Sequence, residues 1–542
     1  MKDFWRGGSL FVWVSASGVA ISLLMVGGML TLIMVQGLGQ FWPAPLEEVM
    51  LTNGQTVIGQ AVGEEASPSS INEQHPEGQT RYRFKVGNRD AFGSDFRWIN
   101  GADIAARTTP LDLVGIERRE WGPAYGRVLG VLDRGTNAVE EITAWPDILE
   151  AIREAQALHY RIQHIEREEV GDINRRIEAA RLERRRLTLE GTFSPREQDK
   201  DSELAATMAG LEQEYHSKTS ELESLYHRAE QKSLILKLSN GKTTRLPLAQ
   251  VIAVTRPNAM GWFEKATTYV ASLWGFVSGE PREANTEGGI FPAIFGTVLM
   301  VFLMTLAVVP FGVMAAVYLR EYARQGAVVR LVRIAVNNLA GVPSIVFGVF
   351  GLAFFIYALG GSLDQWLFPE SLPNPTFGTG GILWASLTLA LLTVPVVIVA
   401  TEEGLSAVPR DFREGSLGLG ATRFETIRHV IVPCALPGIL TGLILAMARA
   451  AGEVAPLMLT GVVKLAPSLP LDGQFPFLHL DRKFMHLGFH IYDVGFQSPN
   501  VEAAKPMVYM TTLVLIVVVV TLNFLAVVLR DRLRKRYATS GV

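Results

Sequence analysis

Cysteine and charge are both scarce in this chain of 542 residues. The single cysteine, Cys434, excludes an intramolecular disulfide and a multi-cysteine zinc or iron–sulfur site. Only 19% of the residues are charged and 49% are hydrophobic, whereas soluble proteins are about 25% charged. This balance argues against intrinsic disorder and against a simple soluble enzyme. The net charge of −3 gives no reason to expect nucleic-acid binding.

Long windows without charge indicate a membrane protein. A spanning helix needs about 20 apolar residues, and five charge-free windows can supply them. A sixth apolar stretch is interrupted only by Arg449 and Glu453. The six expected spans are residues 10–37, 290–318, 335–360, 381–400, 435–462 and 507–529. Residues 1–38 are interpreted as an uncleaved anchor because the apolar run is longer than that of a signal peptide.

The distribution of Lys and Arg predicts the orientation of these spans. Arginines gather in the loops after the second and fourth spans and in the tail 530–542, whereas the loop between the third and fourth spans has no Lys or Arg. We therefore expect both termini in the cytoplasm. The core spans would occupy residues 289–529, and the long loop 39–288 would lie outside.

The loop 39–288 has the composition of a soluble domain and divides into four parts. Strand and turn signals dominate 45–147 and 233–256. Apolar residues at three- and four-residue steps predict an antiparallel helical hairpin with coiled-coil packing over 148–230, broken near 191–195. Residues 84–110 faintly resemble 236–257, which indicates either a duplicated β unit split by the hairpin or chance similarity. The aromatic-rich segment 261–276 is expected to be an interfacial helix, with a core helix of the insertion as the alternative.

Motifs for catalysis or metal binding are weak. The string Asn240-Gly241-Lys242-Thr243 resembles the end of a phosphate-binding loop, but Leu236 replaces the required first glycine and a hairpin turn is expected there. His486 and His490 have the i,i+4 spacing of metal ligands, but without a third ligand a loop pair is favoured. We expect no catalytic residue, no metal and no cofactor.

Arg449 and Glu453 are the unusual residues of the fifth span. A charge at mid-membrane costs roughly 2.5–3.5 kcal/mol, and a spacing of four points both side chains in one direction. They are either a salt bridge that only fastens helices or a polar step on a substrate path. Asn337, Asn338 and Ser344, beside the helix breaker Pro343, are weaker candidates for such a path, with helix packing as the alternative.

The sequence of the loop 401–433 predicts a docking element at the cytoplasmic surface. Two short helical stretches are separated by Gly420, and the second has an apolar face formed by Phe424 and Ile427. A short amphipathic element of this kind suits the groove of a partner protein.

The same loop resembles the coupling motif of ABC-importer permeases, E-A-A-x3-G-x9-I-x-L-P. Glu414, Gly420 and Pro433 have the required spacing. The departures are Gly415, Ser416, Val430 and Val432. The strings ARAAGEVAPLMLTG, ATEEGLSAVP and NNLAGVPSIVFGVFG further resemble the PstA-type permeases of bacterial phosphate importers. The resemblance covers about 262–535 closely but does not cover 40–257.

This resemblance implies a fold and a set of partners. The fold would be an all-α type I ABC-importer permease with six transmembrane helices in the bacterial inner membrane, and 39–288 would form an α+β periplasmic insertion. A PstC-like second permease, a PstB-like ATPase dimer and a PstS-like phosphate-binding protein would complete the importer, so the chain itself would not be an enzyme. The coupling residues would be Glu414, Gly420, Ala421, Thr422, Phe424, Ile427 and Pro433.

The resemblance also implies a mechanism, in which ATP-driven movement of the coupling loop rocks the spans and phosphate passes Arg449 while Glu453 balances its charge. Two alternatives stay open. The cargo could be another oxyanion, or the chain could be a membrane scaffold or sensor that acts through its external hairpin.

Overall fold

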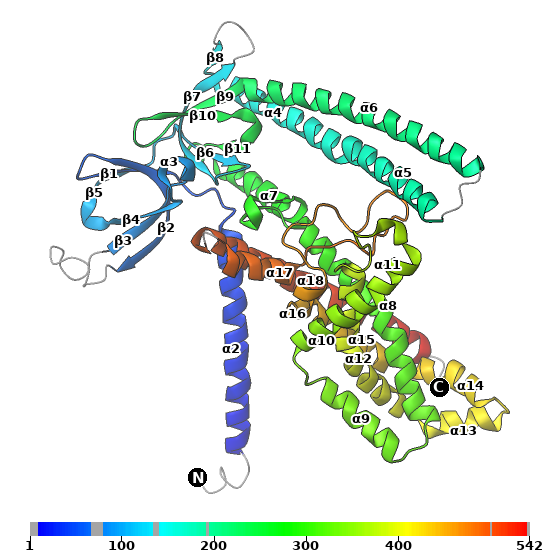
Figure 1. Ribbon diagram of the computed structural model, residues 1–542. Coiled ribbons are helices and arrows are strands. Elements are labelled where there is room, and N and C mark those ends of the chain that lie inside the picture. Colours follow the sequence, from blue (N-terminus) through cyan, green and yellow to red (C-terminus); the bar gives the residue numbers. More distant parts are fainter. Residues whose placement is uncertain (1–8, 67–79, 134–139, 191–194, 499–500, 539–542) are drawn as a thin grey trace. The chain divides into compact units, whose positions relative to one another are not determined.

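The computed structural model describes residues 9–66, 80–133, 140–190, 195–498 and 501–538 (Figure 1). The chain forms two compact units. The membrane unit combines Met1–Gln40 with Phe276–Val542, and the insertion unit is Phe41–Gly275. Residues 276–288, which the sequence assigned to the insertion, thus belong to the membrane unit.

The membrane unit is helical except for a small hairpin, β12 (Pro281–Arg282) with β13 (Glu287–Gly288). Its α-helices are α2 (Ser9–Gly39), α8 (Phe291–Val317), α9 (Ala327–Leu339), α10 (Ser344–Phe350), α11 (Gly361–Leu367), α12 (Ile382–Ser406), α13 (Arg410–Gly418), α14 (Arg423–Thr426), α15 (Val432–Gly452), α16 (Ala455–Thr460), α17 (Leu487–Tyr492) and α18 (Val501–Ala538). Wider π-helical turns are η5 (Tyr318–Tyr322), η6 (Gly351–Gly360), η8 (Ile427–Ile431) and η9 (Asp493–Gln497). Short 3-10 turns are η4 (Glu283–Asn285) and η7 (Pro369–Ser371).

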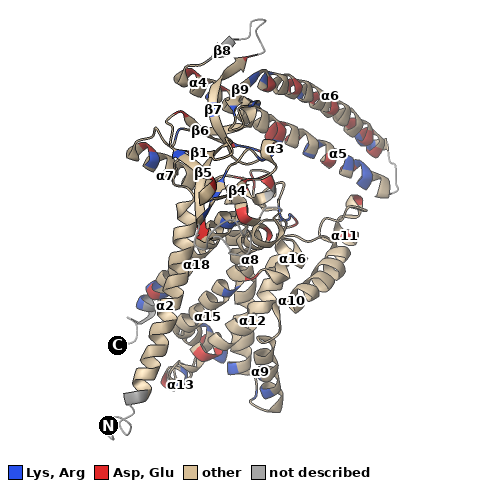
Figure 2. Cartoon of the chain, turned by 90° about the vertical axis from the view of Figure 1, so that its left-hand side faces the viewer, with Lys and Arg blue, Asp and Glu red and all other residues tan. Residues whose placement is uncertain are grey.

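Six helices in the described residues are long and apolar enough to cross a membrane, which confirms the predicted number. They are Phe11–Gly39, Phe291–Tyr322, Ser344–Leu367, Ile382–Ser406, Arg423–Gly452 and Val501–Leu533. Lys, Arg, Asp and Glu are rare on α10, α12 and α15 and frequent on the helices α5 and α6 of the insertion (Figure 2). The tail predicted to start at residue 530 continues α18 up to Ala538.

The third span starts later than the sequence suggested. Residues 335–339 belong to α9, a separate amphipathic helix, and α10 begins after Pro343. Proline lacks the N–H that a continuous helix needs, and it disfavours helical backbone in the residue before it. The chain therefore breaks between Leu339 and Ser344.

Helix α12 lies at the centre of the membrane unit, packed between α8 and α15. Small residues bring α12 and α15 close together. A Cβ atom added to Gly438 would lie 2.6 Å from the Cα of Gly404, and one added to Gly442 would lie 2.5 Å from the Cβ of Ala400. This is the small-residue packing that membrane helices use to approach closely.

The insertion unit contains two antiparallel five-stranded paths with the same strand order. The first runs β4-β3-β2-β1-β5 and the second runs β10-β9-β7-β6-β11, with β8 added beside β7. The strands of the first are β1 (Glu47–Leu51), β2 (Thr56–Ala66), β3 (Thr80–Lys85), β4 (Phe96–Asn100) and β5 (Ile104–Thr108). Those of the second are β6 (Leu113–Arg118), β7 (Ala124–Asp133), β8 (Glu140–Ile142), β9 (Lys232–Lys237), β10 (Thr243–Pro247) and β11 (Val251–Thr255).

Local details agree with a duplication. A 3-10 turn precedes the last strand of each sheet, η1 (Gly101–Asp103) before β5 and η3 (Leu248–Gln250) before β11. The pairing also shifts at the same place in both, at Ala61/Gly63 of β2 and at Val128/Gly130 of β7. The common strand order and the similarly placed irregularities favour a duplicated β unit over chance similarity.

The predicted helical hairpin follows β8 and interrupts the second β module. Its first arm comprises α4 (Trp145–His164), the π-helical η2 (Ile165–Val170) and α5 (Gly171–Glu190), and its second arm is α6 (Pro195–Gln231). The fully buried positions of this arm step from Ile165 to Ile173, one residue more than a heptad, and the wide turn η2 begins at the first of them. Most of the predicted break near residue 191 lies outside the described residues.

The hairpin is rooted in the core of the second module. Ile148, Ala151, Ile152 and Ala155 of α4 belong to the same buried cluster as strand residues such as Leu234. Farther out, charge pairs such as Arg184–Asp201 (Nε–Oδ1, 2.6 Å) and Lys218–Glu169 (Nζ–Oε2, 2.6 Å) join the two arms.

Candidate functional site

The fifth span ends at a proline-induced break, so the expectation of a continuous helix to residue 462 was wrong. Helix α15 ends at Gly452, Glu453 has an extended backbone (φ −78°, ψ 135°), and α16 starts at Ala455. Pro456 explains this position, because its ring would clash with the carbonyl group four residues earlier, that of Gly452.

The break places Arg449 in the last turn of α15 and Glu453 just outside the helix. Their Nε and Oε1 atoms are 3.5 Å apart, and the side chains are 35% and 20% exposed. Among the described residues, Glu453 is the only acidic residue that forms an ion pair with Arg449. The neighbouring Ala446 and Ala450 are fully buried against the bundle. The helix face beside Arg449 is therefore buried in the bundle, whereas the Arg449 side chain itself stays partly exposed.

The three weaker candidates for the path lie on α9 and at the start of α10, whereas Arg449 is on α15. Asn337 and Asn338 are exposed near the end of α9, and Ser344 starts α10. Helix α10 packs on α16, where a Cβ added to Gly348 would meet the Cα of Pro456 at 2.7 Å. Ser344 is therefore on a helix that contacts the segment after the break, whereas the two asparagines belong to a different helix.

The predicted docking element consists of α13 and α14 separated by Gly420. Gly420 has a φ of +89°, a left-handed conformation that favours glycine. Thr422 caps α14 in a capping box, since its hydroxyl accepts from the Glu425 N–H while the Glu425 carboxylate accepts from the Thr422 N–H at 2.8 Å. The local sequence therefore explains both the turn and the second helix.

The element exposes apolar side chains around the turn. Phe412, Leu417, Leu419 and Phe424 are 45%, 49%, 91% and 60% exposed. Ile427 is instead buried in the membrane unit, so the expected shared face of Phe424 and Ile427 is not formed. Of the other predicted coupling residues, Glu414 and Thr422 are exposed, and Ala421 and Pro433 are half-buried.

A buried glutamate, which the sequence reading missed, holds this element. Glu321 of η5 is 9% exposed and accepts a hydrogen bond from Arg413 Nη2 at 2.7 Å. The same Nη2 donates to the Leu405 carbonyl of α12 at 3.0 Å, and Arg423 donates to the Glu321 carbonyl. Sequence reasoning used these arginines only as a signal of membrane orientation. The isolated acid within the arginine-rich loop was the available sign of their second role.

The two histidines with i,i+4 spacing have structural positions. His486 caps α17, because its Nδ1 accepts from the Gly488 N–H at 3.1 Å. Burial lowers the pKa of His486 to about 3 and that of His490 to about 4. Both imidazoles are therefore neutral near pH 7.

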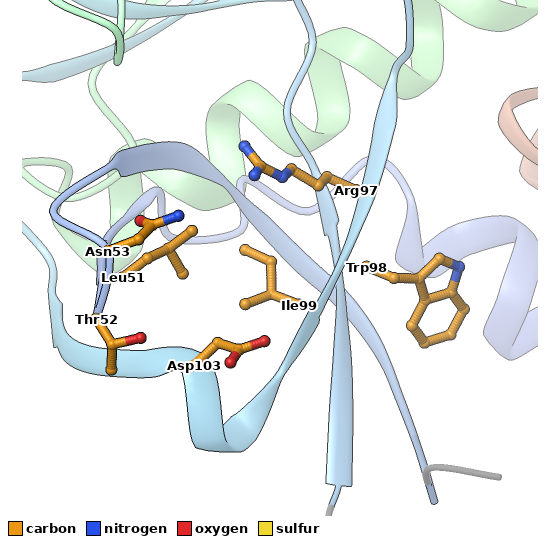
Figure 3. A pocket seen from close by; sticks show the side chains of 7 residues that line it. All are labelled: Leu51, Thr52, Asn53, Arg97, Trp98, Ile99 and Asp103. Carbon is orange, nitrogen blue, oxygen red and sulfur yellow. The ribbon is translucent and has the colours of Figure 1, made fainter. Parts of the chain in front are cut away.

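A pocket of about 250 Å³ lies in the first β module, between the turn after β1 and strand β4 (Figure 3). Arg97 and Ile99 face the side of the β1 turn, whereas Trp98 points to the other side of the strand. Arg97 already donates to Gln55 Oε1 at 3.3 Å, and Asn100 donates to Asp103 at 3.0 Å. With its polar groups paired in this way, the pocket is a weaker candidate than the arginine at the break.

Comparison with known proteins agrees with this architecture. Residues 308–538 match the family described as the binding-protein-dependent transport system inner membrane component. A probable ABC transporter permease of Bacillus subtilis, YqgI, is 32% identical over 42% of this chain and 74% of its own length. The phosphate transport system permease protein PstA 1 of Mycobacterium tuberculosis is 34% identical over 50% of this chain and 79% of its own length.

Among solved structures, a chain of the inward-facing MetNI methionine ABC transporter matches 49% of this chain and 97% of its own length, with 20% identity and a TM-score of 0.32. The extent and identity of the sequence matches establish the family. This chain belongs to the binding-protein-dependent ABC-importer permeases and is of the PstA type.

Proposed function

We propose that this chain is the permease subunit of an ATP-driven importer that carries inorganic phosphate across the bacterial inner membrane. The observation that carries the proposal is the partly exposed Arg449 beside the break after α15. A guanidinium group offers several N–H donors in a fixed plane, which suits the oxygens of a tetrahedral anion. Glu453 balances the charge while no anion is bound, and the name of the Mycobacterium tuberculosis relative supports phosphate as the cargo.

The test is phosphate uptake into vesicles that carry the assembled complex. Arg449→Ala removes charge-assisted hydrogen bonds worth about 1.5–3 kcal/mol, so uptake should fall roughly 10- to 150-fold. Arg449→Lys keeps the charge but not the planar donors, so it should restore only part of the uptake. Arg530→Ala is the control, because Arg530 pairs with its neighbour Asp531 in the C-terminal half of α18.

Competing anions separate the remaining candidates. Excess sulfate or molybdate should leave phosphate uptake unchanged, and strong competition by either would favour another oxyanion as the cargo. If Arg449→Ala transports phosphate normally, the transport proposal fails. A scaffold or sensor that acts through the hairpin would then be the better explanation.

Coupling to a PstB-like ATPase dimer is proposed for α13, Gly420 and α14. Its support is the exposed apolar set Phe412, Leu417, Leu419 and Phe424 on an element anchored by Arg413. Phe424→Ala combined with Leu419→Ala should reduce co-purification of the ATPase. Trp366→Ala is a matched control, since Trp366 is 85% exposed but lies on α11. Equal ATPase recovery from the two samples would contradict the proposed docking surface.

The proposed orientation places both termini in the cytoplasm and the insertion unit in the periplasm. It is supported by the six candidate spans and by the arginine-rich segments after α8, after α12 and in the C-terminal turns of α18. Cys434, the single cysteine, is exposed near the start of α15. In intact cells it should resist a membrane-impermeant maleimide and react after permeabilisation, whereas a cysteine replacing Tyr160 on the hairpin should react when the outer membrane alone is opened. The reverse pattern would contradict this orientation.

We infer that the hairpin docks a periplasmic partner, either the phosphate-binding protein or an equivalent domain of the PstC-like permease. Charged residues are frequent along its arms (Figure 2), and it extends beyond the module core that holds its base. A truncation that removes residues 171–221 and keeps Ile148 to Ala155 leaves that core intact. It should weaken capture of the binding protein or assembly of the complex. Unchanged uptake and unchanged assembly would count against a docking role.

A further inference from the structure

Helix α7 (Trp262–Ser278) exposes an apolar stripe along its length. Phe263, Val270 and Trp274 are 76%, 62% and 70% exposed, and their spacing of seven and four residues places them on one side of the helix. On the opposite side, Thr268 and Ser272 are only half-exposed. This is the reverse of a helix on a soluble domain, which turns its apolar stripe inward.

Both connections to neighbouring spans constrain where α7 can lie. At its C-terminal end, the Phe276 carbonyl accepts a hydrogen bond from the Ile290 N–H at 2.9 Å, and α8 starts at the next residue. In its middle, the ring of Tyr269 is 5.9 Å from that of Trp42, which follows the end of α2 by three residues. The covalent chain therefore keeps α7 close to the ends of two candidate spans.

The composition of the stripe identifies what covers it. No charged residue occurs from 266 to 279, and Trp262 and Trp274 lie near the two ends of the helix. Tryptophan concentrates at the boundary between water and lipid, where its ring meets headgroups and acyl chains. A protein-docking face of this size would be expected to carry polar groups around its rim, whereas a lipid surface requires none.

We propose that the apolar stripe of α7 lies in the headgroup–acyl boundary of the bilayer and anchors the insertion unit to the lipid surface. An interfacial helix of this type enters the bilayer by about 5–10 Å. The anchor would restrict the movement of the insertion unit at the point where the chain continues into α8. This proposal concerns the membrane contact of one helix and does not depend on the transported anion.

Spin labels on single cysteines test the proposal in the full chain with its co-purified subunits. Cys434→Ser removes the native thiol. A nitroxide is then attached at Val270→Cys on the stripe or, as a matched control, at Glu264→Cys, an exposed site outside the stripe on the same helix. In nanodiscs of phosphatidylethanolamine and phosphatidylglycerol, the label at 270 should collide with dissolved oxygen and lose collisions with a water-soluble nickel chelate. The label at 264 should instead collide often with the nickel chelate and less often with oxygen.

Two results would overturn the proposal. Equal nickel accessibility at 270 and 264 would mean that the stripe faces water. Protection of position 270 from both oxygen and nickel, with an immobilised spectrum, would mean that another protein surface covers it. Phe263→Cys repeats the measurement on the same stripe if the Val270 variant does not assemble, so the result does not depend on one substitution.

Discussion

The contact between α12 and α15 can be tested by exchanging two small residues. A Cβ added to Gly442 would be 2.5 Å from the Cβ of Ala400, whereas carbon atoms in contact are about 3.5–4.0 Å apart. Gly442→Ala therefore lacks about 1–1.5 Å of space. Overpacking of this kind costs about 1–3 kcal/mol. Because α12 joins the coupling loop and α15 carries Arg449, the same variant should also impair transport.

Thermal unfolding of the purified complex measures the effect. At about 2–4 °C per kcal/mol for a large domain, Gly442→Ala should lower the midpoint by roughly 2–12 °C. Adding Ala400→Gly removes the facing methyl and leaves the Ala400 Cα at 3.7 Å, an ordinary contact. The double variant should therefore recover most of the loss. In the same helix, Gly452→Ala is the control, since a Cβ there meets no atom within 4 Å.

The double variant decides whether this reasoning is correct. If the two substitutions act through one steric contact, their effects must be strongly non-additive, with a coupling of about 1–3 kcal/mol. Additive losses would mean that the contact between Gly442 and Ala400 does not limit the approach of α12 and α15. A normal midpoint for Gly442→Ala alone would refute the steric argument directly.

Three further predictions concern sites outside this contact. Gly415→Ala restores the alanine of the coupling motif at a position where a Cβ meets no atom within 4 Å. It should stabilise α13 by about 1 kcal/mol, measured as a higher unfolding midpoint with ATPase binding retained. Glu321→Gln removes the charged acceptor of Arg413, so the amount of phosphate transported per ATP hydrolysed should fall while the membrane unit remains folded. The same ratio in the variant and the unchanged protein would contradict a positioning role for Glu321.

His490 has a pKa lowered to about 4 by burial, so the unfolded chain binds its proton first as the pH falls below about 6.5. Stability should thus decline between about pH 6.5 and 4, by up to about 3 kcal/mol from this group. His490→Gln should flatten that decline in unfolding midpoints, and an unchanged slope would contradict the assignment.

The sequence was sufficient to predict the number of spans, because each apolar window exceeds the length that a membrane helix needs. It was insufficient for telling the prolines at which a helix breaks, Pro343 and Pro456, from Pro310, Pro395 and Pro437, which lie inside helices that continue. Pro343 and Pro456 divide hydrophobic stretches that are each long enough for one continuous span, and hydropathy does not register the lost N–H or the ring clash. The second break decides where Arg449 and Glu453 lie relative to the helix end.

The coupling loop shows a second limit of sequence reasoning. Gly420 and the Thr422 capping box follow from local chemistry and were predictable as a turn and a helix start. Whether Ile427 is exposed or buried depends on its long-range packing among residues such as Leu405. The bond between Glu321 and Arg413 joins residues 92 positions apart, so the isolated acid could be noticed in the sequence but its partner could not be identified from a local pattern.

The duplicated β modules explain how this permease could accommodate a long hairpin. The hairpin lies between β7 and β9, the second and third strands of its module, and the first module connects its equivalent strands β2 and β3 over residues 67–79. An insertion at a strand connection leaves the pairing of both modules unchanged. The base of α4 fills the module core, whereas the outer arms are stabilised by contacts with each other. The length of the outer hairpin can therefore vary without altering either β module, and truncation beyond the base tests partner binding separately from folding.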